Sequence, residues 1–279
     1  ITEVVSYLVW FELVVPFKNA TVENPTPFMS HISYNPILSF AIYLVLHEIF
    51  FNKKLSNIQF TFYSFFAISM TINMFITGGR AGQVTFFVML AILIFQVLDK
   101  QRIKSILTIL ITIPLIFFGS YQSSELFKKR VDLSVFEVMN YSENKESSLG
   151  SRINFGLNSL EVIKENSLIG VGTGDFPSEY KKINDIASPE YPSTDNPHNM
   201  YILILMQLGI LGLISMMSIF YYQIKLSFNS KNKFIQNSAI TLPLLFLVMM
   251  LSDSYLLGHY TSLLFVFFSS FLYKDFEKS

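Results

Sequence analysis

Apolar segments long enough to cross a membrane recur along this chain, and they constrain its fold more than any other feature. Of the 279 residues, 51% are hydrophobic and 14% are charged, whereas soluble domains contain about 25% charged residues. A membrane-crossing helix needs roughly 20 apolar residues. We place eight such helices, several of them short, over residues 1–16, 36–51, 58–77, 81–98, 104–119, 199–224, 235–252 and 258–273. The chain is therefore expected to be an all-α, polytopic membrane protein.

The connections between these helices alternate in charge. Lys and Arg are enriched on the cytoplasmic side of membrane proteins. All strongly basic connections lie on one side of the eight-helix arrangement, and their cations are Lys53, Lys54, Lys100, Arg102, Lys104, Lys225, Lys231, Lys233, Lys274 and Lys278. This side is predicted to be cytoplasmic, which places the C-terminus in the cytoplasm and residues 120–197 outside it.

The chain begins with Ile1 inside an apolar segment, and Glu3 and Glu12 make residues 1–17 unlike a secretory signal peptide. We expect the chain to be a C-terminal fragment that lacks earlier membrane helices. It contains no Cys, so disulfides and thiolate metal sites are excluded. The net charge of zero favours no class of partner, and we expect contact with membrane lipid but none with nucleic acid.

Residues 120–197 form a long polar connection with twelve acidic and eight basic residues, hence a net charge of −4. Such a length without structure would be unusual, and two amphipathic helices are predicted in it. The first follows Ser151, a good N-cap residue, and has apolar positions at Ile153, Leu157, Leu160 and Ile163; the second follows Asp175, with Phe176, Tyr180 and Ile183 on one face. We therefore divide the chain into membrane helices at 1–119, a helical external segment at 120–197, and three membrane helices with a cytoplasmic C-terminus at 198–279.

The two predicted external helices are joined by Gly170-Val171-Gly172-Thr173-Gly174. A glycine-rich stretch can cradle phosphate, but no strand precedes this one and no Lys-Ser/Thr pair follows it. We favour a turn in which the glycines permit close packing.

The external segment ends at Asp195-Asn196-Pro197-His198-Asn199. Proline disfavours helix at the residue before it and suits the start of a helix. His198 is therefore expected at or near the first turn of the next membrane helix, at its outer end. There it is either an interfacial residue without a chemical role or a proton acceptor at the edge of a membrane cavity.

Two arginines map to the same outer side. Arg80 follows Thr77-Gly78-Gly79 in a tight turn, and Arg152 follows Gly150-Ser151 at the start of the external helix. Each could simply touch lipid headgroups. The alternative is an anionic diphosphate ligand, because the guanidinium group is always charged and donates hydrogen bonds in pairs.

The remaining titratable residues give weaker signals. Asp253 and His259 flank an outer turn, where a site role is possible but not favoured, and His31 and His47 are expected to be interfacial. No HExxH or GxSxG motif and no carboxylate cluster is present. We therefore expect neither a metal site nor a cofactor.

The order and spacing of several motifs resemble the O-antigen ligase and polymerase superfamily. The stretches that carry the resemblance are Gly150-Ser151-Arg152, Ile169 to Phe176, Pro197-His198-Asn199 with Tyr201, and Gln207 to Gly212. Thr77-Gly78-Gly79-Arg80 resembles the family's Ser-x-Ser-Arg turn, with the serines replaced. The resemblance covers about residues 60–225.

This resemblance implies a helical bundle of the GT-C glycosyltransferase type, in the bacterial inner membrane, with its active site facing the periplasm. It implies a glycan donor linked to undecaprenyl diphosphate. The implied acceptor is a lipid A-core sugar in a ligase and another lipid-linked glycan in a polymerase. Carried over by motif, Arg80 and Arg152 bind the diphosphate without a metal, His198 is the base or orients the acceptor hydroxyl, and Asn199 helps to bind substrate.

Three functions are weighed on this basis. The first is a lipid-linked glycan transferase, with ligase placed ahead of polymerase. A flippase for the same lipid would place charges near mid-membrane and contain broken helices. A structural scaffold would leave Arg80, Arg152 and His198 unexplained. The cations in outer turns favour chemistry at one membrane face.

Overall fold

The computed structural model describes residues 1–18, 20–140 and 146–274, which form helices and no strand. In chain order the helices are α1 (Thr2–Trp10), α2 (His31–Phe51), α3 (Asn57–Ile76), α4 (Arg80–Val97), α5 (Arg102–Ser123), α6 (Glu125–Met139), α7 (Ser148–Glu165), α8 (Phe176–Ala187), α9 (Met200–Ser227), α10 (Lys233–Met249) and α11 (His259–Leu272). Five of these described helices, α2, α3, α4, α5 and α9, are long and apolar enough to cross a membrane. The expected all-α, polytopic membrane fold is confirmed.

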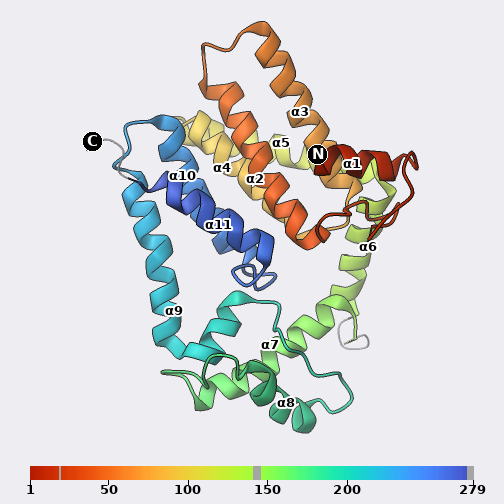
Figure 1. Ribbon diagram of the computed structural model, residues 1–279, viewed down its shortest axis with the longest axis vertical. Helices are drawn as coiled ribbons and strands as arrows, with labels where there is room; N and C mark the ends of the chain where they lie inside the picture. Colours follow the sequence, from red (N-terminus) through yellow and green to blue (C-terminus); the bar gives the residue numbers. More distant parts are fainter. Residues whose placement is uncertain (19, 141–145, 275–279) are drawn as a thin grey trace.

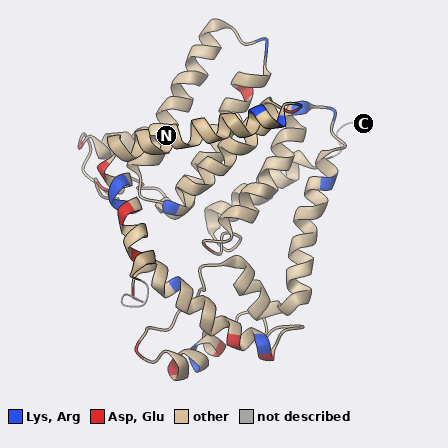
Figure 2. Ribbon diagram, turned by 180° about the vertical axis from the view of Figure 1, so that it is seen from behind, with Lys and Arg blue, Asp and Glu red and all other residues tan. Residues whose placement is uncertain are grey.

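The helices form a bundle with an extension at one end (Figure 1). Helix α2 is central, with contacts to α3, α4, α10 and α11, and α9 lies along the edge of the bundle against α10. Helices α6, α7 and α8 lie beyond the bundle, on the side away from the C-terminus (Figure 1). Many Lys and Arg residues of the turns between bundle helices gather near the C-terminus, at the opposite end (Figure 2).

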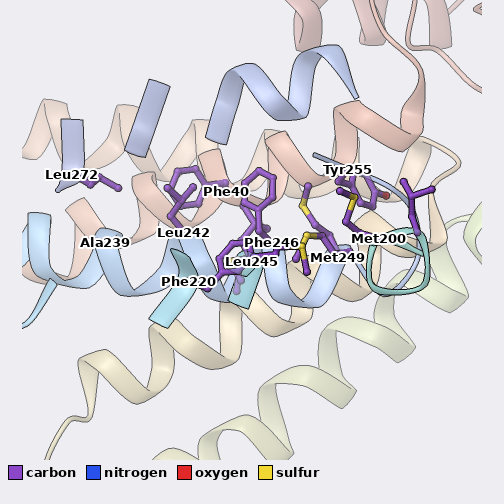
Figure 3. Packing of buried hydrophobic residues seen from close by; sticks show 14 of the residues in the cluster. Phe40, Met200, Phe220, Ala239, Leu242, Leu245, Phe246, Met249, Tyr255 and Leu272 are labelled. Carbon is purple, nitrogen blue, oxygen red and sulfur yellow. The ribbon is translucent and has the colours of Figure 1, made fainter. Parts of the chain in front are cut away.

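The core of the bundle is apolar and tightly packed. Phe40 from α2, Phe220 from α9, and Leu242 and Phe246 from α10 are each at most 1% exposed, and they meet where the helices cross (Figure 3). Dense packing of this kind makes the bundle a rigid mount for the turns at its ends.

Glycines in the turn between α3 and α4 let α4 start directly against α2. A Cβ atom at Gly82 would collide with Asn35, and one at Gly79 would lie 2.5 Å from the Asn35 side-chain nitrogen. The hydroxyl of Thr77 donates a 2.8 Å hydrogen bond to the Asn35 side-chain oxygen. These contacts fix the position of Arg80, the first residue of α4.

Helix α9 is broken at Gly209, whose φ of 61° lies in the left-handed region. The loop before α8 enters the break: a Cβ at Gly209 would collide with the backbone of Leu168, and one at Gly170 would collide with the backbone of Gln207. The loop also supplies backbone hydrogen bonds, from Val171 N to Met206 O at 2.9 Å and from Ile210 N to Ser167 O at 2.9 Å. The prediction that the glycine-rich turn permits close packing is confirmed, whereas the single helix predicted over 199–224 is bent.

Helices α1 and α6 differ from the sequence prediction. The helix predicted over residues 1–16 ends at Trp10 and has nine residues, far fewer than the roughly 20 of a membrane-crossing helix. Helix α6 was not predicted, because its C-terminal half has apolar residues on almost every side and therefore no clear helical periodicity.

The external helices also differ in detail. Helix α7 begins at Ser148 and its N-cap is Ser147, whose hydroxyl accepts a 3.0 Å hydrogen bond from Gly150 N. The cap predicted at Ser151 is therefore wrong by a full turn. The second helix does start after Asp175, although that side chain makes no capping hydrogen bond.

Helix α7 packs on α8 through polar side chains. Asn158 is buried, and its side-chain nitrogen donates to the Tyr180 hydroxyl at 3.3 Å and to the Asn184 oxygen at 3.2 Å. Leu157 and Leu160, two of the predicted apolar positions of α7, are 53% and 43% exposed. The contact between the two external helices therefore depends on hydrogen bonds at Asn158.

Candidate functional site

Five separate parts of the chain surround a cavity of about 210 Å³ at the end of the bundle next to α6 and α7. It is lined by the start of α2, the turn between α3 and α4, α6, α7, and the turn between α10 and α11. Among the lining residues are His31, Arg80, Arg130, Arg152 and Asp253. The structure thus brings together both arginines singled out in the sequence.

A larger hollow of about 700 Å³ lies between α1, α3, α5 and α6. Its charged lining residues are Glu23, Glu125 and Lys129, and it contains none of the predicted site residues. Volume alone would favour this hollow. We favour the smaller cavity, because it collects three arginines and a buried carboxylate at one point.

Arg80 is held by α6. Its Nη1 donates to Glu137 Oε2 at 2.8 Å and to Ser134 Oγ at 3.0 Å. The Glu137 side chain is 4% exposed, while that of Arg80 is 30% exposed. Because a buried carboxylate is costly unless it is paired, this ion pair fixes α6 across the start of α4 and leaves part of the guanidinium facing the cavity.

Arg152 lies in the second turn of α7, not at its N-terminus as predicted, because α7 begins four residues earlier. It lines the cavity together with the α3–α4 turn. Its positive charge acts on Asp253 in the α10–α11 turn. The helix thus brings a cation from the external segment to the end of the bundle.

His198 lies just before α9, with the N-cap Asn199 between it and the first helical residue. Its φ of 51° is in the left-handed region, which is uncommon for residues other than glycine. The turn is held by Asn196, whose side-chain oxygen accepts a 2.9 Å hydrogen bond from His198 N. The prediction that His198 lies at or near the first turn of this helix is confirmed, and the hydrogen bond from its backbone N–H to Asn196 holds the turn.

The imidazole of His198 has a carboxylate partner. Its Nδ1 lies 3.2 Å from Asp253 Oδ1, and the two side chains are 35% and 13% exposed. The ring also stacks on Phe155 from α7, with the ring centres 6.1 Å apart. A histidine with one nitrogen held by a carboxylate has a fixed orientation and tautomer, which leaves the other nitrogen for chemistry.

Burial alone would raise the pKa of the Asp253 carboxyl. Hydrogen bonds from His198 and from the backbone N–H of Ser254, together with the charges of His198 and Arg152, nevertheless lower this pKa below its ordinary value. The Ser254 N–H donates at 2.7 Å. Asp253 is therefore ionised at neutral pH and can orient the imidazole.

The side chain of Asn199 bonds to the start of α9 and to the residues after α10. The side-chain oxygen accepts hydrogen bonds from Tyr201 N at 3.0 Å and Ile202 N at 3.1 Å, and the nitrogen donates to Leu251 O at 3.1 Å. It caps α9 and ties it to the end of α10. Its predicted part in substrate binding stays a prediction.

The comparison with known proteins decides the family. The model of the family described as O-antigen ligase matches residues 65–217, more than half of the chain. The chain belongs to the O-antigen ligase family. The matched region contains Arg80, Arg130, Arg152 and His198, whereas Asp253 lies beyond it.

One curated protein is similar over a large part of the chain. It is an uncharacterized protein of Haemophilus influenzae (strain ATCC 51907 / DSM 11121 / KW20 / Rd), 27% identical over 209 residues. The match covers 71% of this chain and 51% of the relative. The chain therefore spans about half the length of the curated protein that it matches.

Three residues at or next to this candidate site were missed in the sequence or not favoured: Arg130, Glu137 and Asp253. The spacing of Arg130, Ser134 and Glu137 places them on neighbouring turns of one helix, and this signal depended on recognising α6. Asp253 was noted with His259, but His259 is exposed and does not line the cavity.

His31 and His47 were expected to be interfacial residues, and the structure places both in more specific surroundings. His31 lines the cavity at the start of α2, and His47 is 1% exposed inside the bundle. Among the described residues, no group of three or more His, Cys, Asp or Glu side chains could hold a metal ion. Metal-independent chemistry stays a prediction.

Proposed function

We propose that this protein is an O-antigen ligase that transfers a glycan from undecaprenyl diphosphate to a lipid A-core sugar at the periplasmic face of the inner membrane. Its membership of the O-antigen ligase family supports a ligase-type or polymerase-type reaction. The observation that carries the proposal is the cavity in which arginines from α4 and α7 face the turn holding Asp253, the partner of His198.

The cavity matches what the leaving group requires. A lipid diphosphate leaves readily when its negative charge is stabilised, and preorganised cations in a partly dry site do this well. Arg152 and Arg80 occupy that position in the proposed complex. Glu137 anchors the Arg80 guanidinium, and α7 carries Arg152 to the cavity, so both charges are in place before the donor binds.

His198 activates the acceptor in this proposal. The acceptor hydroxyl oxygen attacks the anomeric carbon of the donor sugar while His198 takes the hydroxyl proton. The bond from the anomeric carbon to the diphosphate oxygen breaks, and polyprenyl diphosphate leaves with the electron pair. With Nδ1 held by Asp253, the other ring nitrogen accepts the proton, which contributes roughly 10²–10⁴-fold to the rate.

The proposed orientation follows from charge. The basic turns of the bundle lie at the end near the C-terminus (Figure 2), which the distribution of Lys and Arg assigns to the cytoplasm. The cavity lies at the other end, where a periplasmic active site belongs. The broken helix α9 does not favour a flippase, because the backbone groups at its break are bonded to the loop before α8.

The surface glycan of a strain lacking the gene tests the proposal. A ligase predicts uncapped lipid A-core together with long lipid-linked polymer, and a gene copy with His198→Ala should fail to restore capping. Core that carries a single repeat unit identifies a polymerase. Glycan trapped on the cytoplasmic side identifies a flippase and contradicts the proposed reaction.

A further inference from the structure

The cavity contains more positive charge than its carboxylates neutralise. Three arginines line it, on α4, α6 and α7. Glu137 pairs with Arg80, and Asp253 pairs with His198. Within residues 1–18, 20–140 and 146–274, neither Arg130 nor Arg152 forms an ion pair. Two guanidinium groups are therefore left with their charge available to a ligand.

Arg130 is well placed to meet an anion at the turn between α3 and α4. Its Nη2 would lie 3.4 Å from a Cβ atom at Gly78, so the guanidinium packs against the glycine backbone of that turn. The carbonyl oxygen of Arg130 accepts a 2.7 Å hydrogen bond from Ser134 Oγ, the same atom that accepts from Arg80. The contacts that hold Arg80 therefore also hold the turn of α6 that carries Arg130.

The number of free cations indicates the ligand. A diphosphate linked at both ends carries two negative charges, one on each phosphoryl group, and each can accept paired hydrogen bonds from a guanidinium. We propose that Arg130 is a donor-binding residue and that Arg130 and Arg152 together hold the two phosphoryl groups of the diphosphate. This inference rests on the proposed function, which supplies the diphosphate, and it adds a residue from α6 to the site.

The proposal divides the work among the three arginines. The Nη1 of Arg80 already donates hydrogen bonds to Glu137 and Ser134. In the proposal, Arg80 therefore acts on the ligand mainly through its charge rather than through paired hydrogen bonds. Arg152 holds one phosphoryl group at α7, and Arg130 holds the other at the α3–α4 turn. A monophosphate of the same lipid reaches only one of these two cations.

The test compares two probes on the purified protein in detergent micelles: a polyprenyl diphosphate and the polyprenyl monophosphate with the same chain. The unchanged protein should prefer the diphosphate. Arg130→Gln should weaken diphosphate binding about 10–100-fold, the range of a lost charged hydrogen bond, and change monophosphate binding less than about threefold. Lys129→Gln is the matched control, because the neighbouring Lys129 lines the other hollow; it should preserve the preference.

The outcomes separate the two claims. A protein that prefers the diphosphate equally well with and without Arg130 overturns this inference and leaves the proposed function standing. A wild-type protein that binds neither probe contradicts the proposed function itself. If Arg130→Gln does not elute as a folded species, Arg130→Lys decides: at least a threefold loss of the preference supports the paired contact, and an unchanged preference refutes it.

Discussion

Each end of the bundle contains a histidine held by a polar partner, and the two surroundings differ in charge and access. At the end near α7, His198 is 35% exposed and its Nδ1 faces the carboxylate of Asp253. At the other end, His47 on α2 is 1% exposed, its Nε2 lies 2.9 Å from the side-chain nitrogen of Asn237 on α10, and its ring stacks on Phe51.

The groups around the two rings differ in the same way. His47 belongs to a neutral network, in which Gln96 on α4 donates to Thr241 Oγ1 at 3.0 Å and accepts from the Tyr43 hydroxyl at 2.8 Å. His198 stands beside the cavity lined by Arg152 and two further arginines. Hydrogen bonds between neutral side chains join membrane helices, whereas charge that is open to a cavity can act on a substrate.

The largest effect should come from His198. We expect His198→Ala to lower glycan transfer by a factor on the order of 10² or more, because the proposed base acts in the transition state, while donor binding to the arginines persists. The depressed pKa of Asp253 keeps its carboxylate ionised at neutral pH, so the partner of the imidazole carries its charge under the conditions of the assay. Turnover and donor binding by the purified protein check both expectations.

A second substitution separates the two roles of His198. Glutamine can donate and accept hydrogen bonds but is a very poor base. Near-normal transfer by His198→Gln would mean that the residue only positions the acceptor. Near-normal transfer by His198→Ala would make it an interfacial residue and remove the chemical contrast with His47.

The second-largest effect should come from replacing an arginine at the cavity by lysine. Arg152→Lys should lose most transfer activity, about tenfold or more, because an ammonium group cannot replace the paired donors of a guanidinium on a phosphoryl group. Arg80→Lys should lose less, because lysine can still pair with Glu137. The comparison is made by initial rates at saturating acceptor.

Lys164→Ala controls for general charge on α7, because Lys164 is 67% exposed and pairs only with Glu161 within the described chain. It should transfer at the normal rate. Full activity in Arg152→Lys, with the protein properly inserted, would contradict a bidentate contact at this position.

The sequence predicts the end of the bundle that holds the candidate site better than it predicts the end that holds His47. Arg80, Arg152 and His198 each closely follow a glycine or a proline that marks the end of a predicted helix or loop, so their common location at one membrane face could be predicted without knowing which helices touch. That Arg80 and Arg152 line one cavity, with His198 bonded to a third lining residue, depends on α6 and on the α10–α11 turn. Asp253 and Glu137 become recognisable only through the cations that they meet in space.

Local patterns could not reveal what tertiary contacts decide. Gly209 and Gly212 occupy the same apolar run, yet only Gly209 leaves the helical conformation, because the loop containing Gly170 bonds to the chain there. His47 likewise lies in an apolar segment whose sequence does not show that Asn237, 190 residues later, faces it. The apolar composition of the chain predicts the fold class, but helix packing decides which group becomes the partner of each buried polar side chain.

The smallest effect on transfer should come from His47. The bond between His47 and Asn237 joins α2 to α10, and hydrogen bonds between membrane helices contribute about 0.6 kcal/mol on average and up to about 1.7. We expect His47→Ala and Asn237→Ala each to lower the unfolding temperature in detergent, with a coupling energy in this range in a double-mutant cycle. Transfer per folded molecule should stay within about twofold of normal. His47→Ala could instead lose transfer as strongly as His198→Ala at an unchanged unfolding temperature. His47 would then take part in the reaction, and the proposed difference between the two histidines would be wrong.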